Sequence, residues 1–213
     1  VRRYGLIDGV IGHDFYANVN GRKFDHFDPD FAYLLTHPNH IIHDILKREL
    51  GHDTFEEGFE LPTSYNTWQY AFTVDKKINS KKLIEGLASA SPYIPHFNNM
   101  GEFRLDVIKP LYGAEGHSIS NDDVIDFTFS RTPIEQVYTK VELKYEWDYA
   151  RGEFNKNEVA SITGYGAYTP DYYGLESEST RTIDDDRGKY IRAEGTATDF
   201  AAWMLMWSIN QHL

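Results

Sequence analysis

Three histidines and an aspartate near residue 40 have the types and spacing that could bind a metal ion. His37, His40 and His43 follow one another at intervals of three, and Asp44 lies four residues after His40. On an α-helix this spacing places two imidazoles and a carboxylate on one face. The spacing supplies no further ligand, unlike a His-Glu-x-x-His motif. We therefore predict that these side chains lie on the solvent side of an amphipathic helix and form no metal site.

Other groups of side chains give weaker indications of a binding site. The runs Asn121-Asp122-Asp123 and Asp184-Asp185-Asp186 place their carboxylates on consecutive residues, without the alternating spacing and glycine of a calcium loop. Gly164-Tyr165-Gly166 lacks the third glycine and the lysine of a phosphate-binding loop. We interpret all three as turns. The absence of cysteine excludes thiol nucleophiles and disulfides. We predict no catalytic, cofactor-binding or metal-binding residue, and no enzymatic activity.

Aromatic residues make up 15% of the chain, and one group of them could form a platform that stacks on sugar rings. Tyr and Trp are also the residues that are enriched at protein interfaces. We favour a role in the core or at an interface. A β-rich carbohydrate-binding or glycan-degrading module is kept as the alternative function. The group comprises Trp147, Tyr149, Tyr165, Tyr168, Tyr172 and Tyr173.

A long β-strand over 137–149 is the element that the sequence predicts most clearly. Apolar and aromatic residues mostly occupy one parity, and Lys alternates with Glu or Asp on the other. A period of two is typical of a strand with one buried and one solvent-exposed face. Alternating charges keep the exposed face soluble and hinder pairing with stray edges. We expect this strand to pair antiparallel with a strand near 124–130, across a link that ends at Pro133.

Shorter alternating runs predict further strands, and three segments have helical periodicity. The additional strands are expected at 15–19, 70–74, 103–107, 125–129, 158–163 and 189–192. The first helix is expected to begin at Pro38 and end before Gly51, with Ile41, Ile42, Ile45, Leu46 and Leu50 on its buried face. The second is expected to begin after Asn79 or Ser80 and stop before Pro92, with Leu83, Ile84, Leu87 and Ala88 buried. The third is expected to begin with a capping box of Thr196 and Asp199, with Phe200, Trp203, Met204 and Trp207 buried.

Composition limits the class of protein. A chain of 213 residues with 41% hydrophobic residues is long enough for one large or two small folded domains. The net charge of −12 opposes tight binding to nucleic acid, which needs clustered Lys and Arg. No apolar run is long enough to cross a bilayer. Because the chain starts at Val1 and ends at Leu213 just after an apolar helix, we expect it to be part of a longer protein.

These elements together predict an α+β fold, with extended antiparallel sheets of a barrel-like or tube-like kind flanked by three helices. We expect an α/β portion over 1–117 and a β-domain with the C-terminal helix over 118–213.

A succession of short sequences also spans most of the chain. They are Asn20-Gly21-Arg22, residues 41–51 and 81–85, Met100-Gly101-Glu102-Phe103, Asp123-Val124-Ile125, Ser130-Arg131-Thr132, and residues 140–145, 161–166 and 201–212. This succession resembles the tail-tip or baseplate-hub proteins of tailed bacteriophages and of related contractile or gene-transfer particles. The resemblance implies a structural protein of the virion, assembled in the host cytoplasm.

The resemblance also implies partners and an assembly. In that family the paired β-domains of each chain imitate two tail-tube subunits, so that a homotrimer presents a near six-fold ring. The ring joins the tail tube or distal tail protein to the central spike or fibre, next to the tape-measure protein. It forms part of the conduit for DNA ejection, with no specific nucleic-acid binding, and an acidic surface suits this because it does not hold phosphate. We predict that some Tyr and Trp residues lie at subunit contacts.

Overall fold

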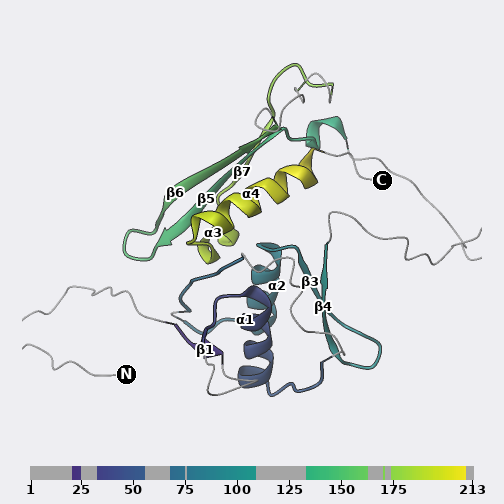
Figure 1. The fold of residues 1–213 in the computed structure, drawn as a ribbon, viewed down its shortest axis with the longest axis vertical. Coiled ribbons are helices and arrows are strands. Elements are labelled where there is room, and N and C mark those ends of the chain that lie inside the picture. Colours follow the sequence, from purple (N-terminus) through teal and green to yellow (C-terminus); the bar gives the residue numbers. More distant parts are fainter. Residues whose placement is uncertain are drawn as a thin grey trace, which may run out of the picture.

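The computed structural model describes residues 21–24, 33–55, 68–74, 76–108, 133–162, 170 and 174–209. Within these residues the chain has four α-helices and seven strands, which confirms the predicted α+β class (Figure 1). The strands expected at 15–19 and 124–130 lie outside the described residues, as does the expected domain boundary at residue 117.

The first helix, α1 (Pro38–Asp44), continues into a π-helical turn, η2 (Ile45–Glu49). Pro38 lies in its first turn, where no hydrogen bond needs its missing N–H. Gly51 follows the end with a φ of 65°, a conformation that glycine adopts at little cost. Both predicted ends are therefore confirmed. Leu50 is 51% exposed, so its predicted burial is wrong.

Helix α1 is buried on all sides, which the sequence pattern did not predict. It lies beside α2 (Ser80–Ser89) and the short strand β1 (Lys23–Phe24), which pairs antiparallel with β2 (Tyr33–Leu34) (Figure 1). His40 and His43 are 5% and 7% exposed and Asp44 is 1% exposed. The prediction that they face solvent is therefore wrong, because neighbouring elements cover the polar side of the helix as well as its apolar side.

Helix α2 begins and ends as predicted and leads into a hairpin. The side chain of Asn79 accepts a hydrogen bond from the Lys82 amide at 3.2 Å, and the four predicted apolar residues are buried. The hairpin consists of β3 (Tyr93–Phe97) and β4 (Phe103–Val107), so the strand expected at 103–107 is confirmed. Its partner β3 was not predicted, because Pro95 cannot donate a backbone hydrogen bond and interrupts a strand pattern.

The alternating segment near 140 forms β5 (Lys140–Asp148), the central strand of a three-stranded sheet. Val141, Leu143 and Tyr145 are buried, whereas Lys140 and the alternate residues are partly exposed, as predicted. The strand starts three residues later than predicted because a short 3-10 turn, η5 (Ile134–Gln136), precedes it. It pairs antiparallel with β6 (Glu153–Ser161) and parallel with β7 (Thr180–Ile183). The strand expected at 158–163 is the second half of β6.

The strand expected at 189–192 does not form: its first two residues belong to a short helix, α3 (Asp186–Tyr190), and Ile191 makes only an isolated bridge. Asp185 caps this helix by accepting from the Arg187 amide at 3.0 Å. Gly188 allows α3 to lie directly against β5, since a Cβ on that residue would be 1.9 Å from the Lys144 carbonyl oxygen. After α3, the carbonyl of Ile191 accepts a hydrogen bond from the Glu146 amide at 3.0 Å. Ile191 therefore pairs with β5 beyond the point where β7 ends.

The last helix, α4 (Glu194–Ser208), runs alongside the sheet and contacts β5 and β6 (Figure 1). It begins two residues before the predicted capping box, and Thr196 does not cap it. The hydroxyl of Thr196 instead accepts from the Gln69 amide at 2.9 Å. Phe200 and Met204 are buried as predicted, but Trp207 is 45% exposed. Two of the four residues predicted to be buried are therefore buried. The buried face of the helix also includes Ala197, Ala201 and Leu205.

Residues 68–74, here called the junction segment, connect the helices of the N-terminal half to the sheet and α4. Tyr70 donates its amide to the Thr36 carbonyl at 2.7 Å and forms an antiparallel bridge with Ile191. Trp68 packs edge-on against Phe200, with ring centroids 6.0 Å apart. Side chains from α1, α2, the junction segment, the sheet and α4 therefore belong to one continuous hydrophobic core. The sequence predicted a strand at 70–74, but only Tyr70 makes a ladder contact.

Candidate functional site

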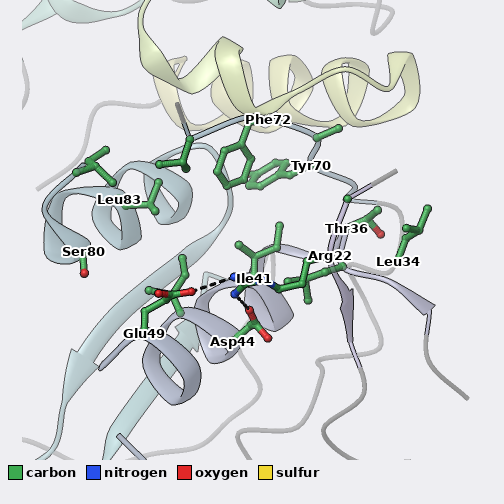
Figure 2. A pocket seen from close by; sticks show the side chains of 16 residues that line it. Arg22, Leu34, Thr36, Ile41, Asp44, Glu49, Tyr70, Phe72, Ser80 and Leu83 are labelled. Atoms are coloured by element: carbon green, nitrogen blue, oxygen red, sulfur yellow. Dashed lines mark hydrogen bonds and ion pairs between the residues drawn. The ribbon is translucent and has the colours of Figure 1, made fainter. Parts of the chain in front are cut away.

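A cavity of about 640 Å³ opens beside α1 (Figure 2). Its walls come from the β1–β2 pair, α1 with η2, the junction segment and the start of α2. These four parts are far apart in the sequence, so no motif could have indicated the cavity.

The polar part of the cavity wall is a network of ion pairs (Figure 2). Arg22 donates to Asp44 at 2.7 Å and to Glu49 at 3.0 Å. Arg48 also contacts Asp44, with its Nε 3.1 Å from Oδ1. The hydrogen bond to Asp44, followed by the one to Glu49, raises the pKa of Arg22 above its usual value. Asp44 is thus a buried carboxylate held between two guanidinium groups, which differs from the metal-binding geometry considered for it.

The rest of the cavity wall is largely apolar. Ile41, Phe72 and Leu83 line it, together with the ring of Tyr70 (Figure 2). The described lining offers apolar contacts and one ion-paired guanidinium, which suits the binding of an apolar group with a polar end.

The three histidines of α1 lie close together, although they do not form a metal site. The rings of His37 and His40 meet edge to face at 5.6 Å, and His43 packs against Phe55 at 4.4 Å. Burial, and then the neighbouring histidines, lowers the pKa of His40 to about 4. Burial also lowers the pKa of His37. No group of three or more potential ligands within the described ranges is arranged to hold a metal ion.

Of the remaining predicted turns, only the acidic run at 184–186 is described. All three aspartates are exposed, but Asp185 caps α3 and Asp186 is its first residue, so the run forms the start of a helix and not only a turn. Asp185 forms a double contact with Arg187 at 2.6 to 3.1 Å, and this hydrogen bonding lowers the pKa of Asp185. The run at 121–123 and the Gly164-Tyr165-Gly166 sequence lie outside the described residues.

The proposed aromatic platform is only partly described. Trp147 packs edge-on against Phe154 at 4.9 Å, and Lys189 places its ammonium 4.5 Å from the Trp147 ring centre. The Tyr149 hydroxyl accepts from the Thr73 amide at 3.0 Å. These two residues thus make contacts within the chain. The other four, Tyr165, Tyr168, Tyr172 and Tyr173, lie outside the described residues.

The sheet carries charges and polar groups beside its buried side chains. Glu142 accepts from Asn157 across the β5–β6 pair at 2.8 Å. The Glu146 carboxylate lies 2.8 Å from the Lys156 ammonium, and Glu146 has a φ of 60°. This left-handed conformation is uncommon for a residue other than glycine, so the backbone twists locally where β5 passes Ile191.

A row of aromatic rings on α4, which runs from the buried Phe200 to the exposed Trp207, was not predicted. Phe200, Trp203 and Trp207 stack in sequence, with centroids 6.1 and 6.2 Å apart. Met206, the residue before Trp207 in the sequence, is 53% exposed. The sequence indicated an exposed apolar surface, because residues 200–209 hold no charged residue. A helix that is apolar on all sides has more apolar residues than one buried face can cover.

The geometry defines a mixed α+β protein in which a three-stranded sheet lies against a C-terminal helix, with an ion-paired cavity beside α1. No protein-family model matches the sequence, and no curated protein matches it. Across the described part of the chain, no helix combines the length and apolar character needed to span a bilayer.

Proposed function

We propose that this chain is a structural subunit of a bacteriophage tail hub, without enzymatic activity, which joins the tail tube to the central spike or fibre. The observation that carries the proposal is the β5–β6 pair. Both strands have nine residues, and α4 contacts both of them while charged and polar side chains stay exposed. A sheet of this kind suits the wall of a ring, because one face supplies the core and the other can meet water or a neighbour.

The charge of the chain supports a conduit more than a nucleic-acid binding site. The net charge of −12 repels phosphate, and Lys and Glu alternate along β5 without forming a basic stripe. In this proposal the β-domain over 118–213 is tube-like, and the hub domain portion over 1–117 contacts neighbouring tail proteins. The partners are the tail-tube or distal tail protein, the tape-measure protein and the spike or fibre.

Two aromatic residues of α4, the partly buried Trp203 and the exposed Trp207, supply a candidate subunit contact. Trp203 and Trp207 are held in one stacked arrangement, so little side-chain entropy is lost when they are buried. Tryptophan is among the residues that contribute most to interface energy. Closed rings of identical chains are a common way to bury such a surface, and a homotrimer is the ring proposed here.

Light scattering coupled to size-exclusion chromatography tests the proposal at micromolar concentration. We expect a trimeric mass and ring-shaped particles in negative-stain electron microscopy. The variant Trp207→Glu should shift the mass to that of a monomer, because it places a charge in the contact. Met100→Glu is the matched control, since Met100 is 82% exposed at the tip of the β3–β4 hairpin and should leave the trimer intact. A strictly monomeric wild-type mass would count against the proposal.

A further inference from the structure

We propose that α1 is an acid-sensitive switch, in which protonation of its buried histidines releases the junction segment and loosens the contact between the helical half and the sheet. The inference does not depend on the proposed function, because it rests on the histidines and the hydrogen bonds next to them.

The histidines are placed where an added charge is costly. His37 lies at the N-terminal cap of α1, and His40 and His43 follow it at intervals of about one turn. His40 and His43 are almost fully buried, and the His37 and His40 rings are in contact. Two protonated imidazoles at this distance repel each other, and burial removes the water that would otherwise screen them.

Among the described residues, the charged groups that act on His40 do not favour its protonation. Within the described residues, the ionisable groups that act on His40 are His37 and His43. From the packed elements, Arg22, just before β1, and Arg48 of η2 both reach Asp44, so the carboxylate nearest in sequence is already engaged by two cations. Beyond Phe55 lies a further histidine, His52.

The N-terminal end of α1 is connected directly to the junction segment. The ring of His37 hydrogen-bonds the backbone of Trp68, and the Thr36 carbonyl accepts from the Tyr70 amide at 2.7 Å. On its other side, the junction segment donates from Ala71 to the Tyr190 carbonyl at 2.9 Å. A displacement of α1 therefore acts on the backbone bonds that hold the two halves of the core together.

The direction of the pH effect follows from the lowered pKa of His40. The pKa of His40 is about 4 in the folded state and near 6.5 in the open state. Its neutral form therefore makes its full contribution to the stability of the closed state above pH 6.5. That contribution decreases as the pH falls from 6.5 toward 4. For His40 alone, the ratio of closed to open α1 should fall on the order of 50-fold between pH 7.5 and pH 4.5.

Hydrogen exchange followed by mass spectrometry at pH 7.5 and pH 4.5, corrected for intrinsic exchange rates, tests the switch. We expect peptides covering α1 and 68–74 to lose on the order of 50-fold in protection at pH 4.5, while peptides from β5 and β6 keep theirs. His40→Gln should remove most of this loss, because glutamine does not titrate. His96→Gln is the matched control, since His96 is 40% exposed beside Asp106, and it should behave like the wild type.

Three results would overturn the proposal: equal protection of 68–74 at both pH values, an unchanged loss in His40→Gln, or loss in β5 and β6 at the same pH, which indicates global acid unfolding. If His40→Gln does not fold, an NMR titration of the wild-type histidines decides. A His40 resonance that titrates near pH 6.5 contradicts the switch, and one that stays neutral down to about pH 4 supports it.

Discussion

At the scale of single residues, Gly188 determines how closely α3 can approach the sheet. Replacing it with alanine would place a Cβ 1.9 Å from the Lys144 carbonyl oxygen, a backbone atom that cannot move independently of β5. We expect Gly188→Ala to lower the free energy of unfolding by about 2 to 3 kcal/mol, measured by urea denaturation.

Gly195, in the first turn of α4, is the matched control for this substitution. No atom lies within 4 Å of the Cβ that alanine would add there. Gly195→Ala should therefore stabilise the chain by about 0.5 to 1 kcal/mol, because alanine is the better helix former. Equal effects of the two substitutions would show that α3 does not pack against β5 as described.

Asp44 is the second residue whose contribution to the free energy of unfolding follows from its surroundings. Its side chain is 1% exposed and contacts both Arg22 and Arg48. Asp44→Asn should reduce the free energy of unfolding by about 3 kcal/mol, because the two guanidinium groups lose their shared counter-charge. Glu49→Gln should cost less than about 0.5 kcal/mol, since Glu49 is 53% exposed and its ion pair with Arg22 is screened by water. Denaturation curves with similar midpoints for both variants would contradict this ranking.

At the scale of secondary-structure elements, one hydroxyl group connects α4 to the junction segment. Thr196 is 1% exposed and accepts from the Gln69 amide at 2.9 Å. Thr196→Val keeps the shape but removes the acceptor, so we expect a loss of about 1 to 2 kcal/mol in denaturant unfolding. Thr198→Val, on the exposed side of the same helix, should change stability by less than about 0.5 kcal/mol. A larger effect at Thr198 would reverse the assignment of the two faces.

The elements that the sequence predicted well are those fixed by local rules. The alternation in β5, the proline and glycine at the ends of the first helix, and the cap at Asn79 depend on residues within a few positions of one another. Strand β7 and the burial of α1 depend on contacts with other elements, such as those of β7 with β5 and of α1 with α2, and no local pattern encodes them. The short helix α3 was missed because five residues are too few to show a helical period.

The candidate site was less predictable than the fold, for the same reason. Arg22 reaches Asp44 across 22 residues, and the apolar wall comes from segments that have no common motif. The histidine spacing was visible in the sequence, but its environment was not, because the cover over α1 is a property of tertiary packing. A helix that is hidden on its polar side as well as its apolar side looks amphipathic in sequence.

At the scale of the whole molecule, charge and apolar surface have opposite effects on assembly. Copies with a net charge of −12 repel one another, whereas the exposed Met206 and Trp207 favour association. Added salt screens the repulsion and leaves the apolar contact in place. Raising sodium chloride from about 50 mM to about 500 mM should therefore shift the average mass in light scattering toward that of the proposed trimer. A shift toward monomer would instead indicate that ion pairs hold the copies together.

The junction segment also has a consequence for the order in which the chain folds during synthesis. The Gln69 amide and the Thr196 hydroxyl that accepts from it are 127 residues apart. At ribosomal rates of about 5 to 20 residues per second, roughly 6 to 25 s pass between their translation. During that time Trp68 and Tyr70 have no sheet or final helix to cover them. In the nascent chain these two aromatic side chains therefore remain without that cover until Thr196 has been made.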